Sequence, residues 1–364
     1  MKILFVTRST LFTVRGGDTV QIIETAAHLR ELGVAVDIKN SAEISEYSGY
    51  ELIHFFNIIR PADIIPHIRK SKLPFVVSTI FVEYSEFDKQ FRQGVSGFLF
   101  KLLHSDAVEY LKNIFRSLLT SNEKIPLQYI IYGHKKTLKE IASKASLLLP
   151  NSESEYNRLK LQYGIHAPYM VIPNGIRPDL FTGNVSPFEK DESLVLCAAR
   201  IEGVKNQLHL IKALNNTKFK LLLIGNPAPN QMSYYNHCRK VAAGNIKFIQ
   251  QLHQDELLAY YKKAKVHVLP SLFETTGLSS LEAAVMGCNV VISNRGDVKE
   301  YFKDFAFYCD PVSTQSILQA IENAAAAPVN PLLTAHIQSN FTWQKAAEQT
   351  LIAYKKVLAA KNFQ

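Results

Sequence analysis

The sequence has few cysteines and shows no metal-binding pattern. Its 364 residues include four cysteines, which lie far apart, and eleven histidines, none of which pairs with another at metal-ligand spacing with a carboxylate nearby. A metal site is therefore not expected, since zinc and similar ions need three or four such ligands brought together. Widely spaced cysteines without redox spacing are typical of reduced thiols in a cytosolic protein.

Motifs that mark common classes of enzyme are missing as well. The chain contains no G-x-G-x-x-G dinucleotide fingerprint, no glycine-rich loop ending in Lys-Ser or Lys-Thr, and no G-x-S-x-G elbow. Such motifs place a pyrophosphate, a nucleoside triphosphate or a serine nucleophile at the start of a helix. Dehydrogenases of the usual type, P-loop NTPases and α/β-hydrolases are thus not indicated.

Long apolar runs are also absent. None approaches the roughly 20 apolar residues that a membrane-spanning helix needs. Only five apolar residues precede Thr7 and Arg8 at the N-terminus, fewer than a signal peptide requires. We therefore expect a cytoplasmic protein. The apolar fraction of 47% supplies enough side chains for two cores, and the length favours two domains.

Positive charge is in excess, and it is unevenly placed. Lys and Arg outnumber Asp and Glu by 41 to 32, and ten of these cations but only four of the acids fall between Lys89 and Lys144. Apolar residues are interleaved with the cations there, which predicts basic amphipathic helices. Such helices can lie on an anionic membrane surface, or they can form a solvated hairpin with its apolar face turned inward. No nucleic-acid-binding motif accompanies them, so nucleic acid is not an expected partner.

The order of apolar segments predicts an α/β protein. Short strand-like runs alternate with stretches of helical periodicity, as in parallel sheets wrapped by helices. Residues 8–19 are expected to form a loop, and the first helix is expected to run from Val20 to Leu32. The expected strands are residues 2–6, 34–38, 52–56, 74–80, 147–149, 194–198, 219–224, 246–249, 266–269, 289–292 and 306–308.

A break in this pattern, at VIPNG in residues 171–175, separates two halves. We predict two Rossmann-like, doubly wound domains, hinged near residues 174–185. The N-terminal domain takes residues 1–175, with the basic insert at about 86–145. The C-terminal domain takes residues 176–341, and the last helix, 342–364, is expected to return to the N-terminal domain.

The most informative segment is residues 271–291. A buried-strand pattern leads into it, Gly277 lies in the turn, and a small-residue helix pattern follows. This order aims free backbone N–H groups at an anion such as phosphate. Glu274 and Glu282 lie in the same segment, and carboxylates accept hydrogen bonds from vicinal hydroxyls, so phosphate and diol together indicate a nucleotide or nucleotide-sugar. For Glu282 a simpler interpretation is also open, because Ser279-x-x-Glu282 fits a capping box.

Two cations follow the first strand of the second half. Arg200 and Lys205, in the sequence ARIEGVKNQ, lie between a strand end and a helix start. They can grip a diphosphate from two sides and stabilise charge on a departing nucleoside diphosphate without a metal. The alternative is a surface loop in which Glu202 pairs with one of them.

Glycines follow two other strands. Gly16 and Gly17 come after the first strand of the chain, and Gly225 comes after the second strand of the second half. Glycine permits close approach of the backbone to a ligand, although a plain loop also explains the Gly-Gly pair. Ligands of open α/β sheets lie at the carboxyl ends of the strands, so these loops are expected to open on one side, with the ligand in the cleft between the domains.

Taken together, these residues resemble the GT-B fold, family 4 retaining glycosyltransferases, over nearly the whole chain. Each motif is modest alone, but their order and spacing are specific. They are the Gly16-Gly17 loop, PNSESEYNRL at 150–159, VIPNGI at 171–176, ARIEGVKN at 199–206, LLLIGN at 221–226, the E-x7-E segment from Glu274 to Glu282, and TWQKAAEQTLIAYKKVL at 342–358.

The resemblance implies retaining transfer of a sugar from a nucleoside-diphosphate sugar, with no metal and no cofactor. It assigns Arg200 and Lys205 to the donor diphosphate and Glu274 to hydroxyls of the donor sugar, and these three are the expected catalytic residues. Glu282 is assigned to the ribose.

The resemblance also implies a backbone contribution to donor binding. A phosphate is expected at the start of the helix after the Glu274 loop, with the loop after the second strand beside it. The first domain's backbone would approach the diphosphate as the cleft closes. The backbone positions concerned are Gly16, Gly17, Gly225, Gly277, Leu278 and Ser279.

Two places depart from the family's pattern. Relatives often carry a histidine at the end of the strand at 75–80, where this chain has Ser78 and Thr79, and many carry Glu-Gly-Phe-Gly where this chain reads FETTGLSS. The acceptor is expected to be a glycan or a lipid-linked molecule of cell-surface polysaccharide biosynthesis, with the inner membrane face as a peripheral location. A GT-B sugar-nucleotide epimerase and a catalytically silent sugar-nucleotide-binding partner remain alternatives.

Overall fold

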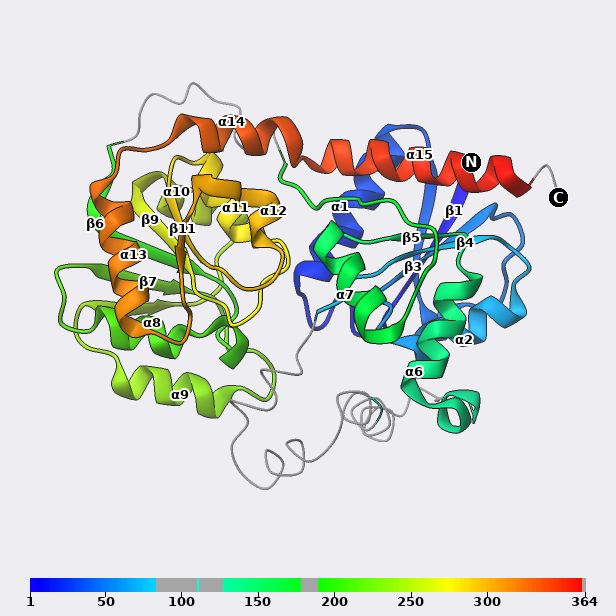
Figure 1. The fold of residues 1–364 in the computed structure, drawn as a ribbon, viewed down its shortest axis with the longest axis horizontal. Coiled ribbons are helices and arrows are strands. Elements are labelled where there is room, and N and C mark those ends of the chain that lie inside the picture. The colour runs from blue at the N-terminus through cyan, green and yellow to red at the C-terminus, as the bar shows by residue number, and fades with distance from the viewer. Residues whose placement is uncertain (83–109, 111–126, 178–188, 362–364) are drawn as a thin grey trace. The chain divides into compact units, whose positions relative to one another are not determined.

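The computed structural model describes residues 1–82, 110, 127–177 and 189–361, which fall into two compact units (Figure 1). The N-terminal unit comprises residues 1–174 and 343–364, and the C-terminal unit comprises residues 175–342. Each unit has its own parallel sheet and its own hydrophobic core. Much of the basic insert and of the expected hinge lies outside the described residues.

The N-terminal unit contains a parallel sheet in the order β2-β1-β3-β4-β5. Most of these strands are buried along nearly their whole length. Continuous apolar strands are expected where helices cover both faces of a parallel sheet. The strands are β1 (Lys2–Thr7), β2 (Ala35–Asn40), β3 (Leu52–Phe56), β4 (Phe75–Ser78) and β5 (Leu147–Leu149).

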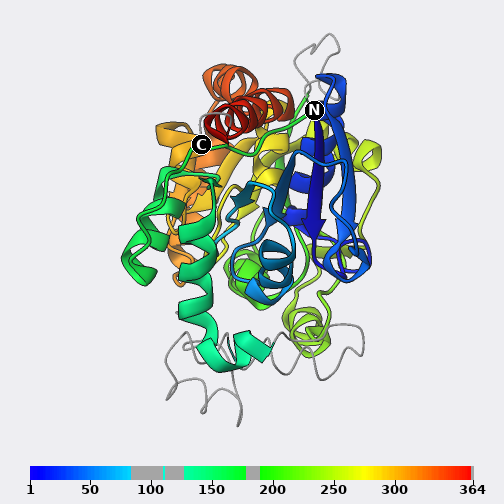
Figure 2. The same ribbon diagram turned by 90° about the vertical axis from the view of Figure 1, so that its right-hand side faces the viewer.

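Helices lie on both sides of this sheet (Figure 2). The chain moves from β1 to β2 in one direction and from β3 through β4 to β5 in the other, so right-handed crossovers place α1 on one face and α2 and α6 on the opposite face. The last helix of the chain, α15, packs against α1. The helices are α1 (Gly17–Glu31), the short η1 (Ser41–Glu43), α2 (Pro61–Lys70), α6 (Leu127–Lys144), α7 (Glu153–Tyr163) and α15 (Trp343–Lys361).

The C-terminal unit contains a parallel sheet in the order β11-β10-β9-β6-β7-β8. The chain builds outward from β6 to β8, returns to the other side of β6 with β9, and then continues to β11. The strand order therefore reverses between β6 and β9, which is the switch point of this sheet. The strands are β6 (Asp191–Ala198), β7 (Lys220–Ile224), β8 (Ile246–Ile249), β9 (Ala264–Leu269), β10 (Asn289–Ser293) and β11 (Phe307–Cys309).

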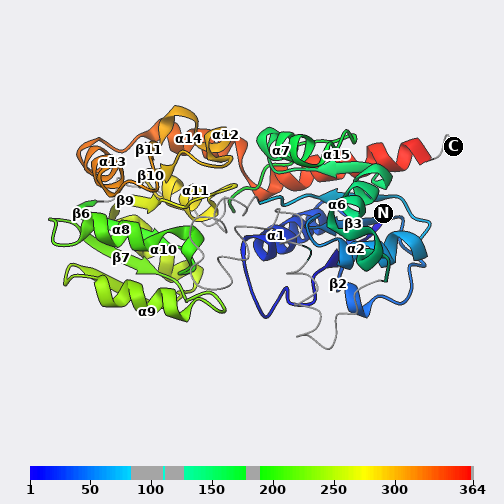
Figure 3. The same cartoon turned by 60° about the horizontal axis from the view of Figure 1, so that its bottom comes forward.

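Helices flank the second sheet as well (Figure 3). Because β8 to β9 and β9 to β10 run in the same direction along the sheet, right-handed crossovers put α10 and α11 on the same face. All four cysteines are free and buried in the core of this unit. The helices are η3 (Gly203–Lys205), α8 (Gln207–Leu214), α9 (Met232–Val241), α10 (Gln254–Lys263), α11 (Leu278–Val285), α12 (Val298–Phe302), η4 (Lys303–Phe305), α13 (Thr314–Ala326) and α14 (Pro331–Asn340).

The predicted fold class is confirmed, because both units are parallel α/β sheets with helices on their faces. Each predicted strand is present, with bounds that differ by three residues at most. The predicted start of the first helix was wrong: α1 begins at Gly17 and not at Val20. Thr19 Oγ1 accepts a hydrogen bond from Gly16 N at 3.1 Å, which closes the first turn earlier than the apolar periodicity indicated.

Candidate functional site

Polar loops gather at the switch point of the C-terminal sheet. The loop after β6 carries Arg200 and Lys205, and the loop after β9 carries Glu274. The two strands are neighbours in the sheet, so their carboxyl ends bring these loops side by side. Switch points of this kind are where open α/β sheets bind ligands.

An ion pair joins the two loops. Lys205 Nζ lies 2.6 Å from Glu274 Oε2, and Ser271 Oγ donates to the same oxygen at 3.0 Å. The side chain of Glu274 is 9% exposed and that of Lys205 is 22% exposed, so solvent screens this pair less than a surface pair. A cation and a carboxylate are thus held at one contact distance at the sheet's ligand-binding edge.

The backbone around Glu274 is fixed from the neighbouring loop. Asp297 N donates to Glu274 O at 2.9 Å, and Gly296 pairs with Glu274 in an isolated bridge. The sequence did not indicate this support, because the two segments lie more than twenty residues apart. The bridge holds the backbone of Glu274 in place from outside its own loop.

Arg200 has a different partner. Its Nη2 lies 3.0 Å from Glu202 Oε1, while Gln207 Nε2 donates to the Arg200 carbonyl at 2.8 Å. The alternative interpretation, in which Glu202 pairs with one of the cations, therefore holds for Arg200 but not for Lys205. At 40% exposure the Arg200 side chain remains accessible to solvent.

The segment after Glu274 turns sharply into α11. Gly277 is the N-cap of that helix with φ 70° and ψ 55°, a left-handed conformation that favours glycine. Leu278 and Ser279 then supply the first N–H groups of the helix, which by helix geometry have no acceptor within it. These N–H groups are donors of the kind that a phosphate accepts at a helix N-terminus.

The capping-box interpretation of Glu282 is wrong. Since α11 starts at Leu278, Ser279 is already its second residue and no side chain caps the helix. The carboxylate of Glu282 points instead to α10. It accepts hydrogen bonds from Gln254 Nε2 at 3.1 Å and from Tyr261 OH at 3.4 Å.

Gly225 allows the ends of β6 and β7 to pack closely together. It has φ 151°, and a Cβ at this position would come within 2.1 Å of the Ala199 carbonyl oxygen. The hydrogen bonds Ala199 N to Ile224 O and Gly225 N to Ile249 O, both 3.0 Å, hold the ends of β6, β7 and β8 together. This position therefore has a structural need for glycine, whatever it contributes to binding.

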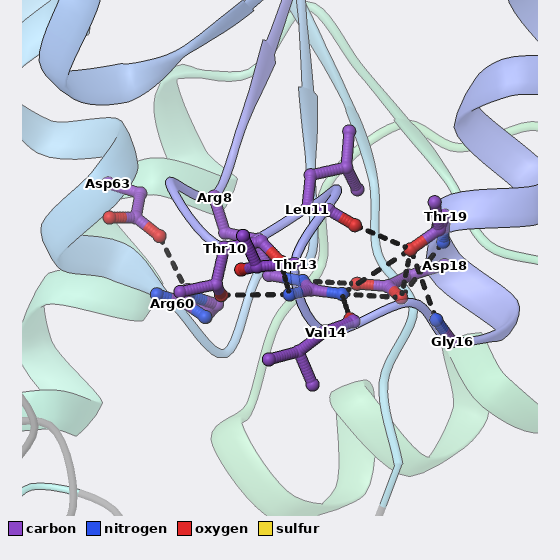
Figure 4. A network of polar contacts seen from close by, with 10 residues as sticks. All are labelled: Arg8, Thr10, Leu11, Thr13, Val14, Gly16, Asp18, Thr19, Arg60 and Asp63. Atoms are coloured by element: carbon purple, nitrogen blue, oxygen red, sulfur yellow. Dashed lines mark hydrogen bonds and ion pairs between the residues drawn. The ribbon is translucent and has the colours of Figure 1, made fainter. Parts of the chain in front are cut away.

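In the N-terminal unit, the loop after β1 is fastened by Arg8 (Figure 4). Its guanidinium pairs with Asp18 at 2.7 Å and donates to the carbonyls of Thr10 at 2.8 Å and Val14 at 2.7 Å. The loop ends at Gly16, whose φ of −150° is extended backbone that any residue adopts. This network was not predictable from the sequence, which only places Arg8 after a strand.

The residues at the end of β4, where members of the resembled family often carry a histidine, are buried in this chain. Ser78 and Thr79 are buried, and Ser78 Oγ lies 2.8 Å from His54 Nε2, whose Nδ1 lies 2.6 Å from Tyr354 OH. Burial lowers the pKa of His54 to about 3, so the ring is neutral. These buried side chains hydrogen-bond to one another within the N-terminal unit.

Glu155 holds the next turn of the chain. It is fully buried, and its carboxylate accepts hydrogen bonds from Thr79 Oγ1, from Phe81 N at 2.7 Å and from Asn151 N at 2.8 Å. Between Thr79 and Phe81, Ile80 has φ 44°, a strained value for a β-branched residue. The Glu155 carboxylate therefore fixes an unfavourable turn just after the carboxyl end of β4.

The described part of the chain shows neither a metal-binding cluster nor a membrane-spanning helix. No group of three His, Cys, Asp or Glu side chains in that part of the chain is placed to hold a metal ion. Among the described helices, none combines the length and the apolar character needed to span a bilayer.

Most of the C-terminal unit is similar in sequence to a known family. Residues 182–338 match the family model of the glycosyl transferases group 1. An uncharacterized glycosyltransferase of Methanocaldococcus jannaschii is 27% identical over 209 residues, covering 51% of this chain and 53% of that protein. The chain thus spans about half the length of that relative. The D-inositol 3-phosphate glycosyltransferase of Kribbella flavida is 21% identical, covering 93% of this chain and 90% of that protein.

Solved structures resemble the whole chain. Sucrose-phosphate synthase from Thermosynechococcus elongatus has a TM-score of 0.75 at 16% identity, covering 99% of this chain and 100% of that one. HepE from Anabaena, in complex with UDP-glucose, has a TM-score of 0.71 at 16% identity, covering 98% of this chain and 100% of that one. The chain therefore has the fold of the GT-B glycosyltransferases, and most of its C-terminal unit matches the family model of the glycosyl transferases group 1.

Proposed function

We propose that the protein is a retaining, metal-independent glycosyltransferase of family 4 that uses a nucleoside-diphosphate sugar. The observation that carries the proposal is the contact of 2.6 Å between Lys205 and Glu274 at the switch point. In a sugar nucleotide, an anionic phosphate is bonded directly to a ring of hydroxyls. A cation beside a hydroxyl acceptor matches that order of chemical groups.

The roles of the side chains follow from their charges. Arg200 and Lys205 bind the diphosphate, and Glu274 accepts hydrogen bonds from the donor sugar. The backbone N–H groups at the start of α11, at Gly277, Leu278 and Ser279, receive a phosphate, since an anion is favoured at that end of a helix. Glu282 and the Gly225 loop lie on the nucleoside side of this arrangement.

The proposed reaction needs little covalent chemistry from the protein. The bond between the anomeric carbon and the phosphate oxygen breaks, and the acceptor hydroxyl oxygen bonds to the same face of that carbon. The acceptor proton passes to the leaving phosphate. The two cations stabilise the charge that develops on the departing nucleoside diphosphate, which is the usual source of rate enhancement at such sites.

Two comparisons support the donor class. HepE, which shares the fold, was solved with UDP-glucose, and the Kribbella flavida relative is a glycosyltransferase by its name. Since both are under 25% identical to this chain, they support a nucleotide-sugar donor but leave its base and sugar open. The Gly16-Gly17 loop is proposed to approach the diphosphate with its backbone.

The acceptor is proposed to be a glycan or lipid-linked molecule in surface polysaccharide biosynthesis, met at the inner membrane face. On α6, the side chains of Ile130, Ile131 and Tyr132 are 48%, 67% and 45% exposed, and the neighbouring Lys135 and Lys136 are exposed as well. Exposed apolar side chains beside lysines suit an anionic bilayer.

Vesicles test the membrane part of the proposal. Ile131→Glu is expected to lower binding to phosphatidylglycerol-containing vesicles at least about fivefold. The change removes apolar area that would be buried in the bilayer, and it adds a negative charge that the anionic lipid repels. Leu161→Glu, at an 85% exposed position on α7, is the matched control and should bind as the wild type does. Equal binding of both variants would refute membrane docking through α6 and leave the donor chemistry untouched.

Calorimetry tests the donor site. A thermal-shift panel of UDP, GDP and ADP selects the nucleotide, since a ligand of the folded state raises the melting temperature. Replacing both Arg200 and Lys205 by alanine is expected to weaken its binding by at least about 3 kcal/mol, since two charge-assisted hydrogen bonds are lost.

The matched control removes the same charge elsewhere. Arg239→Ala with Lys240→Ala removes two exposed cations from α9, where the helix ends away from the carboxyl edge of the sheet. Unchanged binding in the Arg200 and Lys205 variant would overturn the proposal. Product analysis with donor alone separates a transferase from an epimerase, which changes the donor without any acceptor, and from a silent binding partner, which turns over none.

A further inference from the structure

The carboxylate of Glu282 is held by two side chains of one neighbouring helix. Gln254 Nε2, at the start of α10, donates to Oε1 at 3.1 Å, and Tyr261 OH, two turns further along α10, donates to Oε2 at 3.4 Å. The two donors bond to different oxygens of the carboxylate. Rotation about its last bond would break one or both contacts, so its plane is set by α10.

Both donors suit this task. Tyr261 is fully buried, and its burial, together with the nearby charge of Glu282, raises its pKa well above the ordinary value of 10. Its hydroxyl therefore keeps its proton and donates throughout the working pH range. Gln254 is exposed and donates through its side-chain amide.

The helices that carry these groups are joined again at their other ends. Lys190 Nζ donates to Tyr261 O on α10 at 2.9 Å and to Met286 O, just beyond α11, at 2.7 Å. Cys288 Sγ donates to Tyr261 O at 3.2 Å. A cation at the C-terminal ends of two helices is favourable. Because α10 and α11 are fixed there, losing one side-chain contact to Glu282 frees the carboxylate without moving its helix.

We propose that Gln254 and Tyr261 are positioning residues that fix the Glu282 carboxylate as a clamp for the 2′ and 3′ hydroxyls of the donor's ribose, and that they thereby select ribonucleotides over 2′-deoxyribonucleotides. The inference rests on the proposed function, which gives Glu282 the ribose. Two neighbouring hydroxyls meet both oxygens of one carboxylate only if its plane contains the two O–H directions. A carboxylate held in a fixed plane therefore binds a ribose with both hydroxyls more tightly than a sugar with one. A freely turning carboxylate binds the two almost equally well.

The experiment measures discrimination between the two sugars, which a merely structural role would not change. Affinities are determined by calorimetry for UDP, GDP and ADP, for their 2′-deoxy forms and for inorganic pyrophosphate. The variants are Tyr261→Phe, which keeps the buried ring, and Gln254→Ala. The matched controls in the same unit are Tyr235→Phe on α9 and Gln319→Ala on α13, and Glu282→Gln is the reference for a lost clamp.

The wild type is expected to prefer its ribonucleotide at least tenfold over the 2′-deoxy form. That preference should fall at least threefold in Tyr261→Phe and in Gln254→Ala, and nearly vanish in Glu282→Gln. Pyrophosphate affinity should change less than twofold, and both controls should keep the wild-type preference. If the wild type does not discriminate, or if both variants keep its preference, the positioning role is refuted. If the wild type binds none of the three nucleotides, the proposed donor class itself fails.

Discussion

The two sheets place charged residues at the same topological position and use them differently. At the C-terminal switch point, Lys205 from the loop after β6 meets Glu274 from the loop after β9, and Arg200 stays 40% exposed. The N-terminal sheet reverses between β1 and β3, and there Arg8 is only 11% exposed and bonds to its own loop and to the first turn of α1. Equivalent positions in similar folds thus hold a pair that joins two loops and a pair that shapes one.

The number of donors already occupied explains why Arg8 and Lys205 act differently. The Nε, Nη1 and Nη2 atoms of Arg8 donate to Asp18, Thr10 and Val14, so the guanidinium bonds to its own loop and to the first turn of α1. Lys205 has three donors and makes its contact with an acid from another strand end. A cation with remaining donors can meet a phosphate, whereas a cation with none can only hold the chain.

The largest expected effect is on turnover. Glu274→Gln should lower sugar transfer about 100- to 1000-fold, because the neutral amide loses the charge that a transition state with developing charge depends on. The protein should stay folded, since the amide keeps the shape of the side chain. Transfer is measured by release of the nucleoside diphosphate. Glu192→Gln, at the exposed start of β6, is the control, and wild-type turnover in Glu274→Gln would contradict a ligand role for that loop.

Arg8→Ala should act on stability instead. It leaves Asp18 partly buried without its cation, which costs about 3 kcal/mol. The only tryptophan, Trp343, is buried in the N-terminal unit, so its fluorescence during urea unfolding reports on that unit. Adding Asp18→Asn to Arg8→Ala should recover part of the loss. If the double variant is no more stable than Arg8→Ala, the pair does not shape the loop as inferred.

A smaller effect is expected from acid. The pKa of His54 is lowered to about 3 in the folded protein, below the unfolded value of about 6.5, so the unfolded state takes up the proton first as the pH falls. The free energy of unfolding of the N-terminal unit should therefore decline as the pH falls from 6.5 towards 3. The contribution of His54 to this decline is about 2 kcal/mol at pH 5.

His54→Gln removes that titration. The difference in unfolding free energy between pH 7 and pH 5, followed by Trp343 fluorescence, should shrink by about 2 kcal/mol. His67, whose pKa is also lowered, to about 4, keeps part of the dependence. His166→Gln, at an exposed position, should change nothing. An unchanged pH dependence in His54→Gln would show that this ring is not kept neutral by folding.

The smallest effect concerns Glu202. Its carboxylate occupies Arg200 and lies close to the proposed diphosphate, so Glu202→Gln should tighten binding of the selected nucleoside diphosphate about threefold, in line with an exposed ion pair. Calorimetry measures this, again with Glu192→Gln as the control. Weaker binding would mean that Glu202 orients Arg200 for the ligand and does not compete with it.

Strand order and the strand-end rule made much of this site predictable. Arg200, Lys205 and Glu274 each follow a recognisable apolar strand, and parallel sheets collect such positions at one edge. Which acid meets which cation was not predictable, because it depends on the return of the chain from β8 to β9. That return brings Glu274 to Lys205 and leaves Glu202, the nearer acid in sequence, to Arg200.

Contacts between helices could not be predicted from the sequence either, because they also depend on how the chain folds back on itself. Gln254 lies 28 positions before Glu282, and the local S-x-x-E pattern offered a simpler explanation for the glutamate. In the N-terminal unit, Ser78 and Thr79 were noted only for the histidine that they replace. Their buried partners, His54 and Glu155, come from β3 and α7, and nothing in the local sequence connects these segments.

The position of α15 bears on how the protein is made. This helix begins at residue 343, yet it packs against α1, which starts at residue 17. A ribosome delivers residues in order, so the whole C-terminal unit has emerged before the final piece of the N-terminal unit exists. The half that is synthesised first is completed last, and a nascent chain that stalls before residue 343 exposes the flank of α1 that this helix covers.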